Sequence, residues 1–241
     1  VDGGDGVRHA GACVASLPLS TFGRLTAMDA LEKQVDAFRA AYRREHVGPR
    51  YRGALHFGVT ATGALCGIAI ALVRVHNLDV RALLVVPAAF LFANVVEHLA
   101  HRYVMHVPRG PLRFLYERHT LQHHRFFMAA QMSVESTRDW KIVLFPPAVI
   151  FFFLGGIGLP CALALDALLP RSNVGPLFAA TAAGYFLLYE LCHLAWHQPD
   201  DSVIARLPGV RRFREHHRRH HREATRGFNV TFPIADAIFR T

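Results

Sequence analysis

The chain has 241 residues, of which 52% are hydrophobic and 19% charged, and its formal net charge is +9 with histidine neutral. This composition excludes an ordinary soluble enzyme, a disordered chain, and a collagen-like, coiled-coil or disulfide-rich protein. A basic and apolar chain suits an anionic membrane surface, and the high apolar content favours a membrane over nucleic acid as its neighbour.

The N-terminal region divides into a leader and a helix. Residues 1–27 are small, polar and rich in glycine, and they lack the continuous apolar core of a signal peptide. We expect a poorly ordered leader here and a single membrane-embedded domain over residues 28–241. Residues 29–44 predict a helix, because apolar side chains recur at helical spacing at Leu31, Val35, Phe38 and Tyr42. This helix lies either on the membrane surface or against the protein's own cap.

Four apolar stretches are candidates to cross a bilayer: residues 53–73, 82–96, 142–169 and 177–196. The first has no charged residue and would be about 32 Å long as a helix, which matches a hydrocarbon core of roughly 30 Å. Prolines and glycines interrupt the third stretch, which is therefore either one broken span or a re-entrant hairpin.

Two hairpins of two spans place residues 1–52, 98–141 and 197–241 on one side of the membrane. These segments hold 24 of the 27 lysine and arginine residues, so the positive-inside rule predicts that this side is cytoplasmic.

All but two of the 27 basic residues are arginine, which is typical of a GC-rich bacterial genome. We therefore expect an integral protein of a bacterial inner membrane.

Histidine carries the main chemical signal of the sequence. Ten of the 16 histidines fall in four tight groups: His101 and His106; His119, His123 and His124; His193 and His197; and His217, His220 and His221. Spacings of three and four residues place side chains on one face of a helix, so the last two groups can each converge on one centre. The step of five from His101 to His106 turns by about 140° in an α-helix, so these two either reach different ions or lie where the helix ends before Pro108.

Neutral imidazole binds iron, zinc, copper and nickel, and ten rings exceed what one ion can bind. We therefore predict two metal ions. The groups contain no cysteine, which argues against a thiolate zinc site or an iron-sulfur cluster. We expect His98 and His216 to have supporting or surface roles, since they lie beside the spaced positions.

Glu97 and Glu190 stand at the ends of apolar spans, close before His101 and His193. An ionisable group at such a place is costly without a partner, so both are functional candidates. We expect each carboxylate to accept the outer N–H of a ligating imidazole and so to set its tautomer. The alternative is an ion pair with a nearby arginine such as Arg102.

The motifs HxxxxH, HxxxHH, HxxxH and HxxHH on two transmembrane hairpins resemble those of the fatty acid hydroxylase and sterol desaturase superfamily of membrane di-metal oxygenases. The resemblance covers residues 53–241, and residues 227–241 (GFNVTFPIADAIFRT) resemble the C-terminal signature of that family. It implies that the ten histidines bind two metals, functionally iron, which zinc can replace during purification. The second motif is often HxxHH; here Thr120 stands at the expected place and His119 one residue earlier, so His119 is the least secure ligand.

The resemblance implies an all-α integral membrane protein of about four transmembrane helices in two hairpins, with a cytosolic helical cap that bears the di-metal site. The expected reaction uses O2 to hydroxylate a C–H bond of a fatty acyl chain or related lipid. Residues 151–153, Phe178, Phe186 and Leu187 are candidates to line the lipid site. Electrons would come from a cytochrome b5-like protein, a ferredoxin or a reductase.

Two other functions remain open from the sequence. A lipid or sterol desaturase would use the same centre, and a non-enzymatic metal or haem carrier would use histidines alone. The arginines of residues 211–222 resemble a nucleic-acid patch, but the histidines among them fit a metal motif better. We therefore expect these arginines to meet lipid headgroups or an acidic electron donor, and we expect no nucleic acid partner.

Overall fold

The computed structural model describes residues 21–241, with side chains from residue 29 onward. These residues form helices joined by loops, and β pairing among them is limited to one isolated bridge between Met128 and Gln131. The predicted all-α class is therefore confirmed. The expected leader falls mainly on residues 1–20, outside the described part. Helix α1 (Thr21–His46) already begins before the expected boundary at residue 28.

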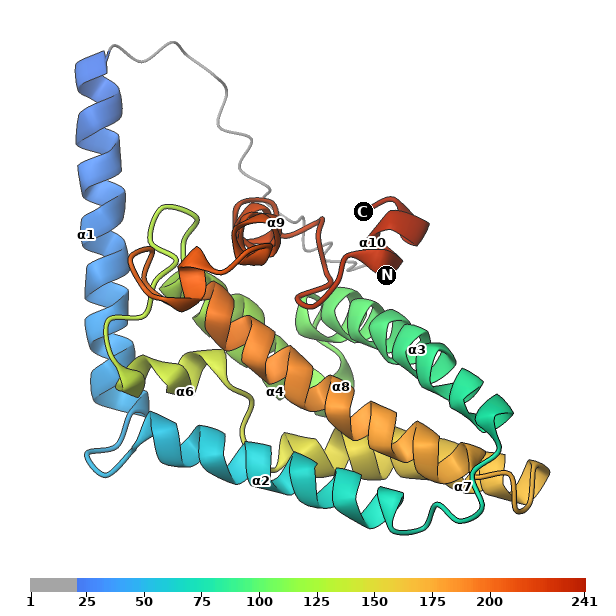
Figure 1. Cartoon of the computed structure of the whole chain (residues 1–241). Coiled ribbons are helices and arrows are strands. Elements are labelled where there is room, and N and C mark those ends of the chain that lie inside the picture. The colour runs from blue at the N-terminus through green and yellow to red at the C-terminus, as the bar shows by residue number, and fades with distance from the viewer. Residues whose placement is uncertain (1–20) are drawn as a thin grey trace, which may run out of the picture.

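Within residues 21–241, four helical segments are long and apolar enough to cross a membrane, as the sequence predicts. The first is α2 (Gly53–Leu72), and the second is the continuous run of η1 (Val80–Leu84), α3 (Val85–Ala100) and η2 (His101–Met105). The third is the run of η6 (Phe151–Gly158) and α7 (Leu159–Leu168), and the fourth is α8 (Val174–Trp196). Figure 1 shows α2 and α3 running in opposite directions, and likewise α7 and α8. Helix α8 is the most buried of the four and contacts α2, α3 and α7. It is thus the central helix of the bundle.

Shorter helices connect and cover the spans. They are η3 (Gly110–Leu112), α4 (Arg113–Tyr116), η4 (Glu117–His123), α5 (His124–Phe126), η5 (Thr137–Asp139), α6 (Trp140–Val143), η7 (Ile204–Arg206), α9 (Val210–Arg222) and α10 (Ile234–Phe239). In Figure 1, α9 lies across the end of α8, and α10 lies beside the end of α3.

The third apolar stretch forms one span and not a re-entrant hairpin. Helix α6 ends at Val143, and Pro146 and Pro147 follow in a non-helical segment, because proline lacks the N–H that a helix interior needs. The chain then continues as one helical run from Phe151 to Leu168. Its first part, η6 (Phe151–Gly158), is a π-helix that contains three glycines.

The apolar stripe of α1 packs against the protein itself, which is the second of the two alternatives. Val35 and Tyr42 are buried, and the Tyr42 ring meets the Phe126 ring edge-on, with centroids 5.5 Å apart. The buried Arg39 donates to the backbone oxygens of Phe126 and Gln131. Helix α1 is therefore held by the loop region that follows the second histidine motif.

A buried carboxylate completes this attachment. Arg43 donates from Nε and Nη2 to the two oxygens of Asp139, at 2.8 and 2.9 Å. The backbone N–H of Glu135 also donates to Asp139, at 2.9 Å. The Asp139 side chain is fully buried, whereas that of Arg43 is 28% exposed. Asp139 thus joins α1 to η5 and to the loop before it.

We expect Asp139→Ala to destabilise the protein by about 2 kcal/mol, because it leaves the Glu135 N–H and part of the Arg43 guanidinium without partners. The measurement is the thermal unfolding midpoint of the purified protein in detergent. Glu45→Gln is the control, since Glu45 makes only an exposed contact of 3.9 Å with Arg44. An unchanged midpoint in Asp139→Ala would show that α1 is held without this carboxylate.

Candidate metal centre

The structure gathers the ten predicted histidines into two adjacent groups. Group A consists of His101, His106, His119, His124 and His220, and group B of His123, His193, His197 and His217; within each, the candidate ligand atoms lie within 4.8 Å of one another. His221 joins group B, because its Nε2 lies 3.2 Å from that of His123 and 3.1 Å from that of His217. Each group could hold a metal ion.

A π-helix brings His101 and His106 together. The two rings are stacked with centroids 5.1 Å apart, and both belong to group A. An α-helix would turn them about 140° apart. Here η2 (His101–Met105) is a π-helix, whose wider i→i+5 turn aligns residues five apart, and His106 follows at its end. His106 thus lies at the helix end before Pro108, which is one of the two alternatives, and its ring belongs to the same group as that of His101.

A second π-helix explains the unusual second motif. Helix η4 (Glu117–His123) places His119 and His124 in group A, with their Nε2 atoms 3.1 Å apart, and sends His123 to group B. Thr120, at the position where the family often has histidine, donates its hydroxyl to the Met105 oxygen at 2.7 Å. That hydroxyl is also 3.2 Å from Nδ1 of His106, where it can accept the ring N–H. The structure thus places His119 in the cluster and Thr120 in support of His106.

Backbone carbonyl oxygens orient half of the rings. Nδ1 lies in hydrogen-bonding contact with the oxygen of a distant residue in five pairs: His101 with Phe228, His123 with Ile142, His197 with Met132, His220 with Arg226, and His221 with Phe127. A carbonyl only accepts, so each Nδ1 carries the proton and each Nε2 keeps a free lone pair. The Nε2 atoms, which carry these lone pairs, face the other rings.

This arrangement fits a cation. The Nε2 atoms of His123 and His221 lie 3.2 Å apart. Neither atom carries a proton, so no hydrogen bond can form between them. Burial lowers the pKa of both rings well below the usual value, so both are neutral at pH 7. Nitrogens bound at right angles to one ion at about 2.1 Å would be about 3.0 Å apart. The contacts between Nε2 atoms in the two groups are 2.7 to 3.2 Å.

Glu97 and Glu190 do not accept the imidazole protons, so this part of the prediction is wrong. Glu97 accepts from the backbone N–H groups of Val230 and Thr231 and from the hydroxyls of Thr231 and Tyr185. Glu190 accepts from the backbone N–H of Phe145. For Glu97 the reason is that the Phe228 oxygen already takes the ring proton of His101, whereas Nδ1 of His193 is buried without a partner among the described residues because Glu190 is used by the Phe145 backbone. Arg102 lies against the rings of Tyr103 and Phe228 and forms no ion pair with either glutamate.

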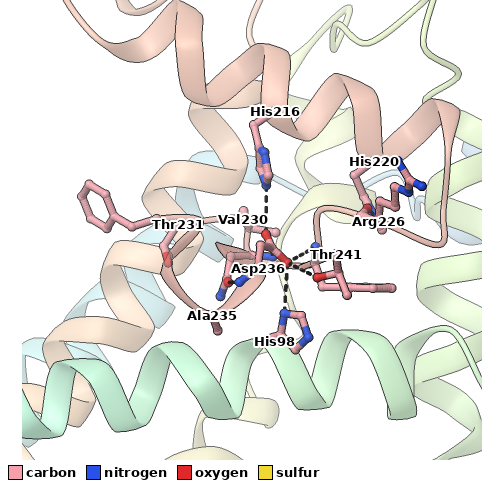
Figure 2. A network of polar contacts seen from close by, with 12 residues as sticks. His98, His216, His220, Arg226, Val230, Thr231, Ala235, Asp236 and Thr241 are labelled. Atoms are coloured by element: carbon pink, nitrogen blue, oxygen red, sulfur yellow. Dashed lines mark hydrogen bonds and ion pairs between the residues drawn. The ribbon is translucent and has the colours of Figure 1, made fainter. Parts of the chain in front are cut away.

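Asp236 is a supporting residue that the sequence did not reveal. Figure 2 shows His98 and His216 reaching it from opposite sides, each 3.0 Å from one carboxylate oxygen. The backbone N–H groups of Phe228 and Asn229 donate to the same carboxylate, each at 2.9 Å. Asp236 therefore fixes the loop whose carbonyls orient His101 and His220. The only sequence signal was the resemblance of residues 227–241 to a family signature.

Asp236→Asn should weaken metal binding at group A by about 10-fold, because the NH2 that replaces one carboxylate oxygen would face one of the two backbone N–H donors, of Phe228 or of Asn229, which bond to different oxygens. Metal content and Co²⁺ titration of the purified protein measure this effect. Glu215→Gln is the matched control, since Glu215 lies on the outer side of α9 and pairs only with neighbouring arginines. Equal affinity in Asp236→Asn and wild type would contradict the role of Asp236.

The pH dependence of the metal-free protein follows from the buried rings. Burial lowers the pKa of His106 to about 3, assisted by His220, and burial lowers the pKa of His220 to about 4. In the unfolded chain both would titrate near 6.5. The unfolded state therefore binds more protons below this pH, and stability decreases as the pH falls from 7 toward 4. Thermal unfolding of the metal-free protein across this range should show the decrease, with a smaller slope in His220→Gln.

Comparisons with known proteins agree with this geometry. Residues 86–241 match the family model described as fatty acid hydroxylase. No curated protein gives a significant match. Among solved structures, the chain is similar to full-length scs7p, of which only the hydroxylase domain is visible, with 21% identity and a TM-score of 0.51. That alignment covers 75% of this chain but only 62% of the other, and it supports the fold. Because the family model spans well over half of the residues, the chain belongs to the fatty acid hydroxylase family.

Proposed function

We propose that this protein is a membrane lipid hydroxylase that uses O2 to insert oxygen into a C–H bond of a fatty acyl chain or a related lipid. The observation that carries the proposal is the convergence of ten histidines into two adjacent, mostly buried groups at one end of an apolar helix bundle. Membership of the fatty acid hydroxylase family supports the same reaction class.

The ten histidines of groups A and B are the proposed ligands of two iron ions. Iron bound there would supply the redox chemistry that activates oxygen, whereas zinc can occupy the same nitrogens in purified protein without that chemistry. The chain contributes the geometry: backbone carbonyls keep the protons on Nδ1, and burial keeps the rings neutral and water away. Glu97 and Asp236 hold the C-terminal loop that carries two of these carbonyls.

An apolar cavity lies beside the histidines and supports an alkyl substrate. The space here is about 660 Å³, part of which is open to the outside, and its walls come mainly from α3, η6 and α8. The predicted lining residues Phe153, Phe178 and Phe186 belong to it. Phe151 does not, since it is 77% exposed, and Phe152 and Leu187 also lie outside the lining. Such a cavity matches the mostly apolar sites that bind small hydrophobic ligands.

The membrane orientation and the electron source complete the proposal. The positive-inside rule supports a cytoplasmic metal centre in a bacterial inner membrane. Electrons would arrive from a cytochrome b5-like protein, a ferredoxin or a reductase. Arg219 and Arg222 on the outer side of α9 are 70% and 56% exposed, which suits an acidic donor protein.

His197→Ala and His220→Ala should each abolish turnover and lower the bound metal, because each removes one nitrogen from group B or group A. Metal analysis and product analysis on the same preparations measure both effects. His76→Ala is the control and should resemble wild type, since only the His76 backbone is bonded, to Asn173. Full activity in either of the first two variants would remove that histidine from the site.

Comparing the lipids of cells with and without the active gene would identify the substrate. Mass spectrometry should show a product that has gained one oxygen atom. A loss of two hydrogens would identify a desaturase instead. A Soret band in the purified protein would indicate a haem carrier and overturn the proposal.

A further inference from the structure

A second, smaller pocket lies between the two histidine groups. Its space of about 270 Å³ is partly open to the outside, and its lining includes His119 of group A and His123 and His193 of group B. Because this pocket touches both groups, a C–H bond placed in it would be close to both metal positions. We call it the histidine pocket, and the larger space described above the alkyl cavity.

Two aromatic residues line both spaces. Phe145 and Tyr189 belong to the walls of the alkyl cavity and of the histidine pocket. Their rings are stacked, with centroids 5.3 Å apart and planes 19° apart. The stacked pair therefore stands between the alkyl cavity and the histidine pocket.

The backbone on the Phe145 side of the pair is tied down. The Phe145 N–H donates to the two Glu190 oxygens, at 3.1 and 3.4 Å, and Arg118 donates to the oxygen of the preceding Leu144 at 2.7 Å. Residues 144–148 are not helical, so these side chains supply bonds that a helix would otherwise make. This gives the buried Glu190 a role that does not involve the histidines directly.

The hydroxyl of Tyr189 does not fix its ring. Tyr189 is 6% exposed, and its hydroxyl has no hydrogen-bond partner among residues 21–241. A buried hydroxyl without a partner destabilises the arrangement that buries it. The rings of Phe145 and Tyr189 are therefore both held by packing alone, while the backbone of Tyr189 belongs to helix α8.

We propose that the Phe145–Tyr189 pair is a partition that an alkyl chain must part to reach the histidines, with Glu190 and Arg118 holding Phe145 in the closed position. The inference rests on the proposed function, since it takes the alkyl cavity as the site of the lipid chain. It adds that access to the metals is set by these two rings and not by the cavity alone. Phe145 and Tyr189 are positioning residues and not ligands.

The test uses the full-length protein in detergent and a fatty acid with a photoreactive diazirine near the end of its chain. After illumination, mass spectrometry maps the labelled residues. In wild type, most label should fall on the walls of the alkyl cavity, such as Phe92 and Ala182. In Phe145→Ala, label on Leu115 and neighbouring residues of the histidine pocket should rise severalfold.

Phe152→Ala is the matched control, because Phe152 belongs to η6, next to the wall residue Phe153, but lines neither space. Its labelling should equal that of wild type. Tyr189→Leu opens the partition from the other side and should also increase label in the histidine pocket. It tests the proposal independently if Phe145→Ala fails to fold. Metal content should stay at the wild-type level in each folded variant, since no histidine is changed.

The outcomes separate the two proposals. If the cavity walls are labelled in all variants but label in the histidine pocket does not rise in Phe145→Ala or Tyr189→Leu, the partition is wrong and the alkyl site stands. If the fatty acid labels the cavity in none of the variants, the alkyl site of the proposed function fails, and the partition fails with it.

Discussion

The crowding of unprotonated imidazoles is the physical constraint on which the rest of this structure depends. Ten rings turn their nitrogens toward two small volumes, with bare Nε2 atoms about 3 Å apart. Lone pairs at this distance repel one another unless a cation lies between them, so the protein must hold the rings in place against this repulsion. The carbonyl contacts at Nδ1, the two π-helices and the burial of the rings all serve this requirement.

The chain after α9 provides much of this support. Residues 226–236 pass between α9 and α3, where Arg226 and Phe228 offer carbonyls to His220 and His101. Buried polar side chains hold this segment, since Asn94 on α3 bonds to several of its backbone groups and Asp236 to others. Each of these polar groups is satisfied by a partner on another element, which makes the region rigid.

The histidine groups lie next to the alkyl cavity but outside it. The histidines lie at the ends of α3 and α8 and on the short helices beyond them, and the alkyl cavity lies between the apolar parts of the same spans. Phe145 and Tyr189 stand at the junction. These two side chains are thus what separates a molecule in the cavity from the histidines.

The sequence by itself determined the helical membrane class, the four spans and the ten histidines, because apolar length and residue spacing are local properties of the chain. It did not decide which histidines share a group. The π-turns at η2 and η4 lie outside an α-helical period, and the expectation that His217 and His220 converge on one centre is wrong, since His217 belongs to group B and His220 to group A. Nor could the sequence assign Glu97, Glu190 or Asp236, whose partners include distant backbone groups, in the case of Glu97 more than 130 residues away in the sequence. Only the tertiary structure brings those groups within hydrogen-bonding distance, because their partners are set by how the helices pack and not by sequence spacing.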